Sequence, residues 1–259
     1  MSGRAPRKSA VVVPLTRHGG ELRVLVGRRH PRSRFLGGFF AFPGGAHEPE
    51  DGDFVADEDG ALRRTAAREL EEETGLHVEP GALRPAGRRV TPPFGPRRFD
   101  SLMYVSTHAR AEEPSPQDPG ELLDLHWTSP AAIVERWRAL EIRIAPPLIP
   151  MLLSLAEGHA PDDAALAARL HEVNADMEAD GPRIEFVPHV LTILLETPTL
   201  PPATHTNCYL AGAQGFLIID PGSGDPAEIA RVVRHARRRA DESGGSAVAV
   251  VLTHPHGDH

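Results

Sequence analysis

The chain has 259 residues, 40% of them hydrophobic and 25% charged, which is ordinary for a globular protein with one large domain or two modest ones. Its formal net charge of −8 argues against a broad nucleic-acid surface, and the sequence shows neither a membrane span nor a signal peptide. The single cysteine, Cys208, excludes an internal disulfide and predicts a cytoplasmic protein, with this thiol buried in a strand rather than reactive.

Short apolar strands and helical patterns alternate through the first part of the chain. Residues 10–15 and 22–27 predict two strands, and His18-Gly19-Gly20 between them predicts a turn. The alternation predicts an α/β (α+β) domain over residues 1–158. Its later elements are a strand at 102–106 and helices at 131–139 and 148–156.

An apolar stripe at four-residue spacing predicts a further helix, which packs against the sheet of this domain. Asp57 or Asp59 can cap the start of the helix, and Gly75 supplies its C-terminal stop. The stripe consists of Leu62, Ala66 and Leu70.

The same helix concentrates acid on one face. Glu69, Glu72 and Glu73 stand at i, i+3 and i+4, where each like-charge pair costs roughly 0.2 to 0.5 kcal/mol. They also lie near the helix C-terminus, which is the unfavourable end of the dipole for anions. A bound divalent cation that prefers oxygen ligands would reverse both effects, so we predict a Mg²⁺ or Mn²⁺ site in preference to a solvated acidic face.

The sequence around these glutamates resembles the Nudix box. Residues 68–76, Arg-Glu-Leu-Glu-Glu-Glu-Thr-Gly-Leu, match every fixed position in the second half of the box, and Phe42-Pro43-Gly44-Gly45 precedes them. The resemblance implies a Nudix α/β/α sandwich with a mixed sheet. It also implies a Mg²⁺- or Mn²⁺-dependent hydrolase that cleaves a substituted diphosphate into two phosphomonoesters.

The resemblance further implies a role for each polar residue. The metal ligands would be Glu69, Glu72, Glu73 and the carbonyl oxygen of Gly45. Arg68 would orient a glutamate through a bidentate pair. The metal would neutralise developing charge and activate the attacking water. The base would be Glu72 or Glu121, since Glu121 lies six residues before Trp127, where many Nudix enzymes keep a mobile acid.

The first half of the box departs from the family pattern, in which the box glycine is followed after five residues by a glutamate and that glutamate after seven more by the arginine. Here Gly45 leads to Asp51, and sixteen residues separate Asp51 from Arg68, which indicates an insertion of about nine residues. Counting back from the arginine instead reaches Gly60, with Glu58 and Asp59 beside it. The sequence therefore leaves open which acid replaces the missing glutamate.

Arginines upstream of the box carry information about the substrate. Arg29, Arg34 and Gly38 have spacings that resemble the extra motif of Nudix enzymes that cleave coenzyme A, although Gly27 and His30 replace its small polar residues. Guanidinium groups can bind phosphates bidentately, so Arg29 and Arg34 are predicted substrate-binding residues, with surface cations as the alternative. The implied substrate is coenzyme A or acyl-CoA. ADP-ribose, NADH and a Nudix module that binds nucleotides without cleaving them are the alternatives.

The remainder of the chain has a different character. Residues 159–182, which include a helical stretch at 162–177, are predicted to form a linker, and the sequence from residue 183 onward is β-rich. The predicted elements of this second domain are strands at 190–196, 207–211, 216–219 and 247–252, and a basic helix at 226–240.

A histidine-rich motif follows the last predicted strand and resembles the first metal motif of the metallo-β-lactamase fold. The resemblance implies zinc ligands, with His254 and His256 on one ion and Asp258 and His259 on another. A complete domain of that family goes on to supply more ligands and the second half of its αββα sandwich. We therefore expect residues 183–259 to form a truncated half of that fold, without hydrolase activity of its own.

Overall fold

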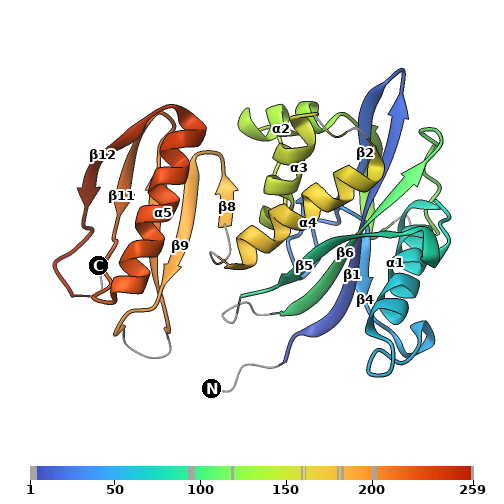
Figure 1. Cartoon of the computed structure of the whole chain (residues 1–259), viewed down its shortest axis with the longest axis horizontal. Coiled ribbons are helices and arrows are strands. Elements are labelled where there is room, and N and C mark those ends of the chain that lie inside the picture. Colours follow the sequence, from blue (N-terminus) through green and yellow to red (C-terminus); the bar gives the residue numbers. More distant parts are fainter. Residues whose placement is uncertain are drawn as a thin grey trace. The chain divides into compact units, whose positions relative to one another are not determined.

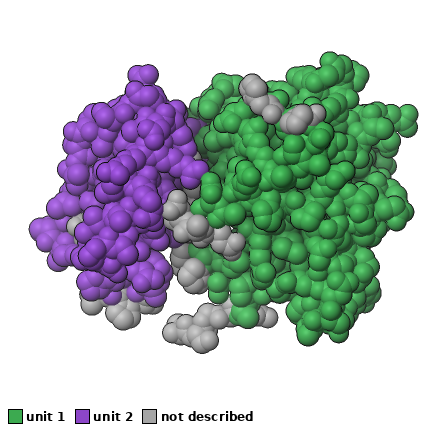
Figure 2. All heavy atoms as spheres, viewed as in Figure 1, with its two compact units in different colours: residues 1–179 green, residues 180–259 purple. Residues whose placement is uncertain are grey.

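The chain forms two compact units, residues 1–179 and residues 180–259, which are described separately (Figure 2). The computed structural model describes residues 5–92, 97–117, 120–158, 160, 162–179, 181, 184–199 and 203–257. Within these residues, no helix combines the length and the hydropathy that crossing a bilayer requires.

A seven-stranded mixed sheet forms the centre of the first unit (Figure 1). Its main path runs β3-β2-β1-β6-β5, with β4 paired to β1 and β7 paired to β2. The β1 and β6 strands are parallel, and the other pairs are antiparallel. The strands are β1 (Arg7–His18), β2 (Glu21–Arg29), β3 (Phe40–Ala41), β4 (Gly44–Ala46), β5 (Arg84–Val90), β6 (Phe99–His108) and β7 (Leu122–Thr128).

The hairpin of β1 and β2 confirms the two strands predicted at the start of the chain. His18 pairs with Glu21 across a two-residue turn, in which Gly19 and Gly20 have φ values of 58° and 85°. Two successive positive φ values are typical of the primed turns that match the twist of a hairpin, and glycine adopts them without strain.

Helices cover both faces of this sheet, which gives three layers (Figure 1). Alternate residues of β1 point to opposite faces: Val13 and Leu15 pack with α2, α3 and α4, whereas Ala10 and Val12 pack with α1. The predicted mixed α+β architecture is thereby confirmed. The helices are α1 (Glu58–Thr74), α2 (Pro130–Arg138), α3 (Ile149–Ala156) and α4 (Asp163–Ala179), with short 3-10 turns η1 (Pro49–Asp51), η2 (Pro80–Ala82) and η3 (Pro146–Leu148).

Helix α1 has the predicted boundaries and stripe. Of the two candidate caps, Asp57 accepts a hydrogen bond from the Gly60 N–H at 3.0 Å, which satisfies one of the free donors of the first turn. Gly75 ends the helix in the left-handed conformation, with φ 75°. The apolar stripe of Leu62, Ala66 and Leu70 is buried against the sheet.

The segment predicted as a linker contains α4, which packs against β5 of the first unit. Asn174 Nδ2 donates a hydrogen bond to the Ala86 carbonyl, and Arg89 Nε donates to Asn174 Oδ1 at 2.8 Å. Asn174 is fully buried and packs against Gly87. These polar contacts give the helix a fixed place on the sheet.

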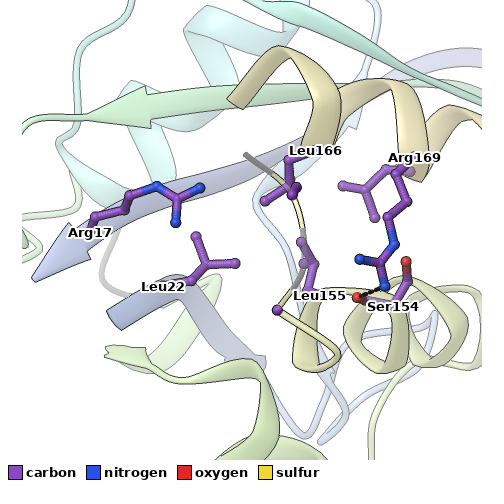
Figure 3. A pocket seen from close by; sticks show the side chains of 9 residues that line it. Arg17, Leu22, Ser154, Leu155, Leu166 and Arg169 are labelled. Carbon is purple, nitrogen blue, oxygen red and sulfur yellow. Dashed lines mark hydrogen bonds between the residues drawn. The ribbon is translucent and has the colours of Figure 1, made fainter. Parts of the chain in front are cut away.

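A small cavity lies where α3 and α4 meet the β1–β2 hairpin (Figure 3). Its volume is ≈ 20 Å³, which is room for about one water molecule. One arginine at its edge, Arg169, donates to the Ser154 carbonyl, and another, Arg17, pairs with Asp163. The cavity is lined by Arg17, Leu22, Ser154, Leu155, Gly158, Ala160, Leu166, Arg169 and Leu170.

The second unit is a five-stranded sheet in the order β12-β11-β10-β9-β8, with α5 packed on it. Cys208 is buried in this sheet, which confirms the predicted buried strand residue, and burial raises the pKa of its thiol to about 12 and so disfavours the thiolate. Every residue of the edge strand β12 is exposed. The elements are β8 (Ile184–Val187), β9 (Val190–Leu195), β10 (Thr206–Ala211), β11 (Gly215–Ile219), β12 (Ser246–Val251) and α5 (Pro226–Ser243).

Candidate active site

Strand β4 brings the backbone into direct contact with the acidic part of α1. A Cβ on Gly44, whose φ is 154°, would collide with the Ala10 carbonyl of β1, and a Cβ on Gly45 would collide with the Glu69 carboxylate. The Gly44 N–H donates to Glu73 Oε2 at 2.7 Å. Glycine is therefore required at Gly44, where the backbone of β1 leaves no room for a side chain, and at Gly45 a side chain would displace the Glu69 carboxylate.

Two of the predicted glutamates are held in a low-dielectric environment. Burial raises the pKa of Glu73 to about 8, although the Gly44 hydrogen bond opposes the shift, and the charges of Glu69 and Glu121 add to it. Burial also raises the pKa of Glu69 to about 7, against the opposing effect of Arg68. Near neutral pH these carboxylates therefore require either a proton or a compensating cation.

Arg68 lies at the centre of the cluster and binds three acids. Its Nε and Nη2 donate to the two carboxylate oxygens of Asp51, both at 2.9 Å, and its Nη1 donates to Glu69 Oε1 and Glu72 Oε2, both at 3.0 Å. The bidentate bond to Asp51 raises the pKa of Arg68 further above its ordinary value. The guanidinium thus fixes the positions of two predicted metal ligands.

The structure places Asp51 at the position that the sequence left open. Asp51 is buried and also accepts a hydrogen bond from Thr65 Oγ1 at 2.9 Å. Burial acts to raise its pKa, but the hydrogen bonds from Arg68, the Glu48 backbone and Thr65 hold the pKa of Asp51 below its usual value. Glu58 pairs elsewhere, with Lys8. The insertion therefore follows Asp51 and leaves the pairing of acid and arginine intact.

The other two acids are more exposed. The side chain of Glu72 retains 45% of its accessible surface and pairs with Arg68. Glu121 is exposed immediately before β7, and its negative charge raises the pKa of both Glu69 and Glu73. The loop before Glu121 is fixed to the end of α1, because the Gln117 N–H donates to the Glu72 carbonyl at 2.8 Å. Four acids thus meet around the C-terminal half of α1.

The donors of this cluster fit a hard divalent cation. In the part of the chain that the structure describes, no three His, Cys, Asp or Glu side chains already stand in the arrangement of a metal site. Arg68 and the Gly44 N–H hold the carboxylates in their present positions. Carboxylate and carbonyl oxygens are the ligands that Mg²⁺ and Mn²⁺ prefer, and buried carboxylates with raised pKa values are the groups that a cation would stabilise most.

The two predicted substrate-binding arginines lie at the end of β2 and on the loop that follows it. Arg29, at the end of β2, donates from Nε to the Phe35 carbonyl at 3.0 Å, and its charge lowers the pKa of Glu73. Arg34 is exposed, and no ion pair of its side chain occurs among the described residues. The structure therefore brings Arg29 to the acidic cluster and leaves Arg34 open to solvent.

The second predicted metal site lies on the turn after β12. Asp220 accepts hydrogen bonds from the Thr253 N–H at 2.8 Å and from Thr253 Oγ1 at 2.7 Å. Since Thr253 Oγ1 donates its proton to Asp220, it accepts a hydrogen bond from His254 Nδ1 at 2.9 Å. Nδ1 therefore carries the proton of the imidazole, and the free lone pair is on Nε2. The rings of His254 and His256 are in edge contact, with centroids 4.9 Å apart. Asp258 and His259 lie outside the described residues.

Comparison with protein families decides the identity of the first unit, because the model of the NUDIX domain matches residues 6–149, more than half of the chain. The chain belongs to the NUDIX family. A second model, that of the metallo-beta-lactamase superfamily, matches residues 201–259 of this NUDIX protein and supports the predicted fusion. Both families generally use divalent metal ions. Neither match distinguishes the coenzyme A branch from the rest of the family.

One of the similar solved structures agrees with the family assignment. A NUDIX hydrolase from Alicyclobacillus acidocaldarius is similar at 27% identity and a TM-score of 0.56, over 63% of this chain and 96% of that chain. The NUDIX domain of Shewanella oneidensis NrtR, solved in complex with ADP ribose, is similar at 20% identity and a TM-score of 0.43, over 60% and 86% of the two chains. A search of curated proteins found no match. This NUDIX protein is accordingly a hydrolase that acts on pyrophosphate bonds.

Two functional contacts of the NUDIX unit were not anticipated from the sequence. Thr65 supports Asp51 from one turn before Arg68, and Gly44 acts as a hydrogen-bond donor to Glu73 as well as permitting close approach. Neither residue type signals its role by itself. The position of Thr65 three residues before Arg68, on the same face of the helix, is the signal that could have identified it.

Proposed function

We propose that the first unit is a Mg²⁺- or Mn²⁺-dependent diphosphatase that cleaves coenzyme A or acyl-CoA into two phosphomonoesters. The observation that carries this proposal is a pair of carboxylates, the buried Glu73 and the half-buried Glu69, that meets the backbone of Gly44 and Gly45. The metal would be held by Glu69, Glu72, Glu73 and the Gly45 carbonyl. When bound, it would neutralise charge on the diphosphate and lower the pKa of the attacking water.

The residues of the chain then have separate roles. Arg68, fixed by Asp51, orients Glu69 and Glu72 toward the ion. Glu121 accepts the proton of the water that attacks phosphorus, while the bond from phosphorus to the bridging oxygen breaks. Of the two candidate bases we favour Glu121, because Glu72 is engaged by Arg68 whereas no ion pair of Glu121 occurs among the described residues.

The choice of substrate rests on the basic loop after β2. Arg29, the last residue of β2, lies near Glu73, and Arg34 is exposed on the loop that follows. Coenzyme A carries a 3′-phosphate in addition to its diphosphate, so it offers more anionic groups to these arginines than ADP-ribose or NADH does. The single buried cysteine is consistent with a cytoplasmic setting for such an enzyme.

The test compares two substrates that differ in one phosphate. Mg²⁺-dependent hydrolysis is measured on coenzyme A, 3′-dephospho-coenzyme A, ADP-ribose, NADH and a diadenosine polyphosphate. We expect coenzyme A to have the highest kcat/KM, and Arg29→Gln and Arg34→Gln to reduce this preference over the dephospho form. Arg32→Gln, at an exposed arginine of the same loop, is the control. Equal losses on both substrates would contradict the coenzyme A assignment without affecting the hydrolase.

We propose no hydrolase activity for the second unit by itself. The two described histidines of its metal motif, His254 and His256, lie on a turn that follows an exposed strand, whereas catalytic zinc normally has three protein ligands and a supporting shell. Assay of the chain with zinc against ester and thioester substrates tests this proposal. Turnover that His256→Ala abolishes would show a working metal site.

A further inference from the structure

One arginine near the basic loop has a fixed position and no acidic partner. The Arg143 guanidinium carbon lies 5.0 Å from the centroid of the Phe39 ring, over its face. Arg143 is exposed, and in the described ranges it forms no ion pair, although Glu141 is two residues away. By contrast, the neighbouring Arg136 and Arg138 pair with Glu141 and Glu135.

The backbone fixes Arg143 beside the strand that leads into the glycine pair. The Phe40 N–H donates to the Arg143 carbonyl at 2.7 Å, and the Ala145 N–H donates to the Phe40 carbonyl at 3.0 Å. Phe40 begins β3, which is followed within three residues by Gly44. The main chain at Arg143 is therefore connected through two hydrogen bonds to the segment that positions Glu73.

A β-bulge places Gly38 and Phe39, the two residues that Arg143 approaches, opposite Arg29 in the sheet. The Gly38 N–H donates to the Arg29 carbonyl at 3.0 Å, and the Arg29 N–H donates to the Phe39 carbonyl at 2.9 Å, so Gly38 and Phe39 both oppose Arg29. Gly38 has a φ of 79°, and a Cβ there would lie 3.2 Å from Arg143 Nη2. The bulge thus places Phe39, with the arginine stacked on it, across from the arginine that is close to Glu73.

The contact with Phe39 leaves the hydrogen-bond donors of the guanidinium available. The ring lies on one side of the group, and the N–H donors, which match the oxygens of a phosphate, have no acidic partner among the described residues. A guanidinium held against a ring is also preorganised, so less side-chain entropy is lost when it binds. A cation that is ordered, exposed and not neutralised by the protein is suited to an anionic ligand.

We propose that Arg143 binds a phosphate group of the diphosphate substrate. This inference rests on the proposed function of the first unit and extends its substrate-binding surface beyond Arg29 and Arg34. Phe39 acts as a positioning residue, since it holds the guanidinium without contacting the phosphate.

The experiment measures KM and kcat of the full chain with Mg²⁺ on coenzyme A and ADP-ribose. We expect Arg143→Gln to raise KM roughly tenfold on at least one of these substrates, as the loss of a charge-assisted hydrogen bond would, with kcat changed by no more than about twofold. Arg143→Lys should recover part of the loss, and Phe39→Leu should raise KM to a smaller extent. Arg138→Gln is the matched control, because Arg138 is also exposed but is paired with Glu135.

The outcomes separate this inference from the proposal on which it rests. If the unaltered chain hydrolyses none of the diphosphates, the proposed function fails. If it is active and Arg143→Gln has the KM of Arg138→Gln on both substrates, the role of Arg143 is overturned. A fall in kcat at unchanged KM would also overturn it. Thermal melts identify any variant that does not fold. If Arg143→Gln is unfolded, the KM of Arg143→Lys, which keeps the charge, is compared with the KM of Arg138→Gln instead.

Discussion

The acidic cluster of the first unit and the histidine turn of the second unit have equally conspicuous sequences but different structural support. Glu73 is 3% exposed and is held by the Gly44 N–H, and Arg68 is fixed by a buried aspartate that lies seventeen residues before it. His254 and His256 instead follow an edge strand that is exposed along its whole length, and Asp220 is the residue that holds their turn.

The difference shows that a motif gives the chemistry of a site, whereas contacts from distant segments decide whether the side chains are preorganised. Three segments of the first unit converge on α1: β4, the turn around Asp51 and the loop before Glu121. Groups held in this way have shifted pKa values before any ligand binds.

The largest effect is expected from Glu73→Gln. This change keeps the shape of the side chain but removes a buried charge that is proposed to bind metal, so hydrolysis should fall by about a thousandfold or more. Glu71→Gln, on the exposed side of the same helical turn, is the control and should retain activity. Steady-state kinetics with Mg²⁺ and a thermal melt measure the two properties. Full activity of Glu73→Gln would contradict the proposal that Glu73 binds the metal.

The next effect concerns the acid that completes the box. Asp51→Asn should destabilise the protein by about 2 to 4 kcal/mol, because it leaves the partly buried Arg68 without its bidentate partner. It should also reduce activity, since Arg68 positions Glu69 and Glu72. Urea unfolding measures the free energy. The exposed Glu50 serves as the control through Glu50→Gln, and an equal loss in both variants would argue against a specific role for Asp51.

The stability of the metal-free protein should depend on pH with a definite sign. The pKa values of Glu69 and Glu73, about 7 and about 8 when folded, lie above the ordinary value of 4.5. The folded state therefore holds protons that the unfolded chain has released, and this stability is lost as the pH rises through 7 to 8. We expect a decrease of roughly 1 to 3 kcal/mol between pH 6 and pH 8.5.

Two comparisons check this pH dependence. In Glu73→Gln the decrease should be smaller, because one of the two titrating groups is gone. Excess Mg²⁺ should raise the melting temperature of the unaltered protein more at pH 8.5 than at pH 6, since a cation binds the ionised carboxylates and not their protonated forms. A melting temperature that rises with pH in the absence of metal would contradict the assignment of these pKa shifts.

The smallest effect is expected in the second unit. His256→Ala should change diphosphate hydrolysis by no more than about twofold, because the two sites share no described partner. Zinc should bind the unaltered chain with a Kd no tighter than about micromolar, given an exposed turn with two described histidines. Isothermal titration with zinc measures the affinity. Nanomolar binding would show that the turn is as well supported as the acidic cluster.

Local patterns were sufficient to predict much of the fold. The Leu62, Ala66 and Leu70 stripe, the Asp57 cap and the Gly19-Gly20 turn depend on neighbours within a few residues, and all three are confirmed. Strand β5, Arg84–Val90, was not predicted because its alternation is weak and three of its seven residues are arginines. Its pairing with β6 and its contact with α4 stabilise it instead.

The candidate site was likewise predicted only in part. The sequence identified the glutamates and Arg68 from their spacing, and the structure brings them together. The sequence did not determine which acid pairs with Arg68. The choice between Asp51 and the residues near Gly60 depends on the path of the inserted segment and not on any local conformational preference. The contact between Arg143 and Phe39 joins residues more than a hundred positions apart, and no periodicity in the sequence indicates it.

The placement of the insertion also has a consequence for evolution and engineering. Asp51 is anchored to Arg68 at one end of the segment and Asp57 to the first turn of α1 at the other, while residues 53–56 between them are exposed. Doubling the length of such a loop costs only about 0.6 kcal/mol in closure entropy. Natural variants could therefore lengthen or shorten this segment, and a fluorophore or affinity tag could be grafted into it, while the geometry of the catalytic helix stays the same.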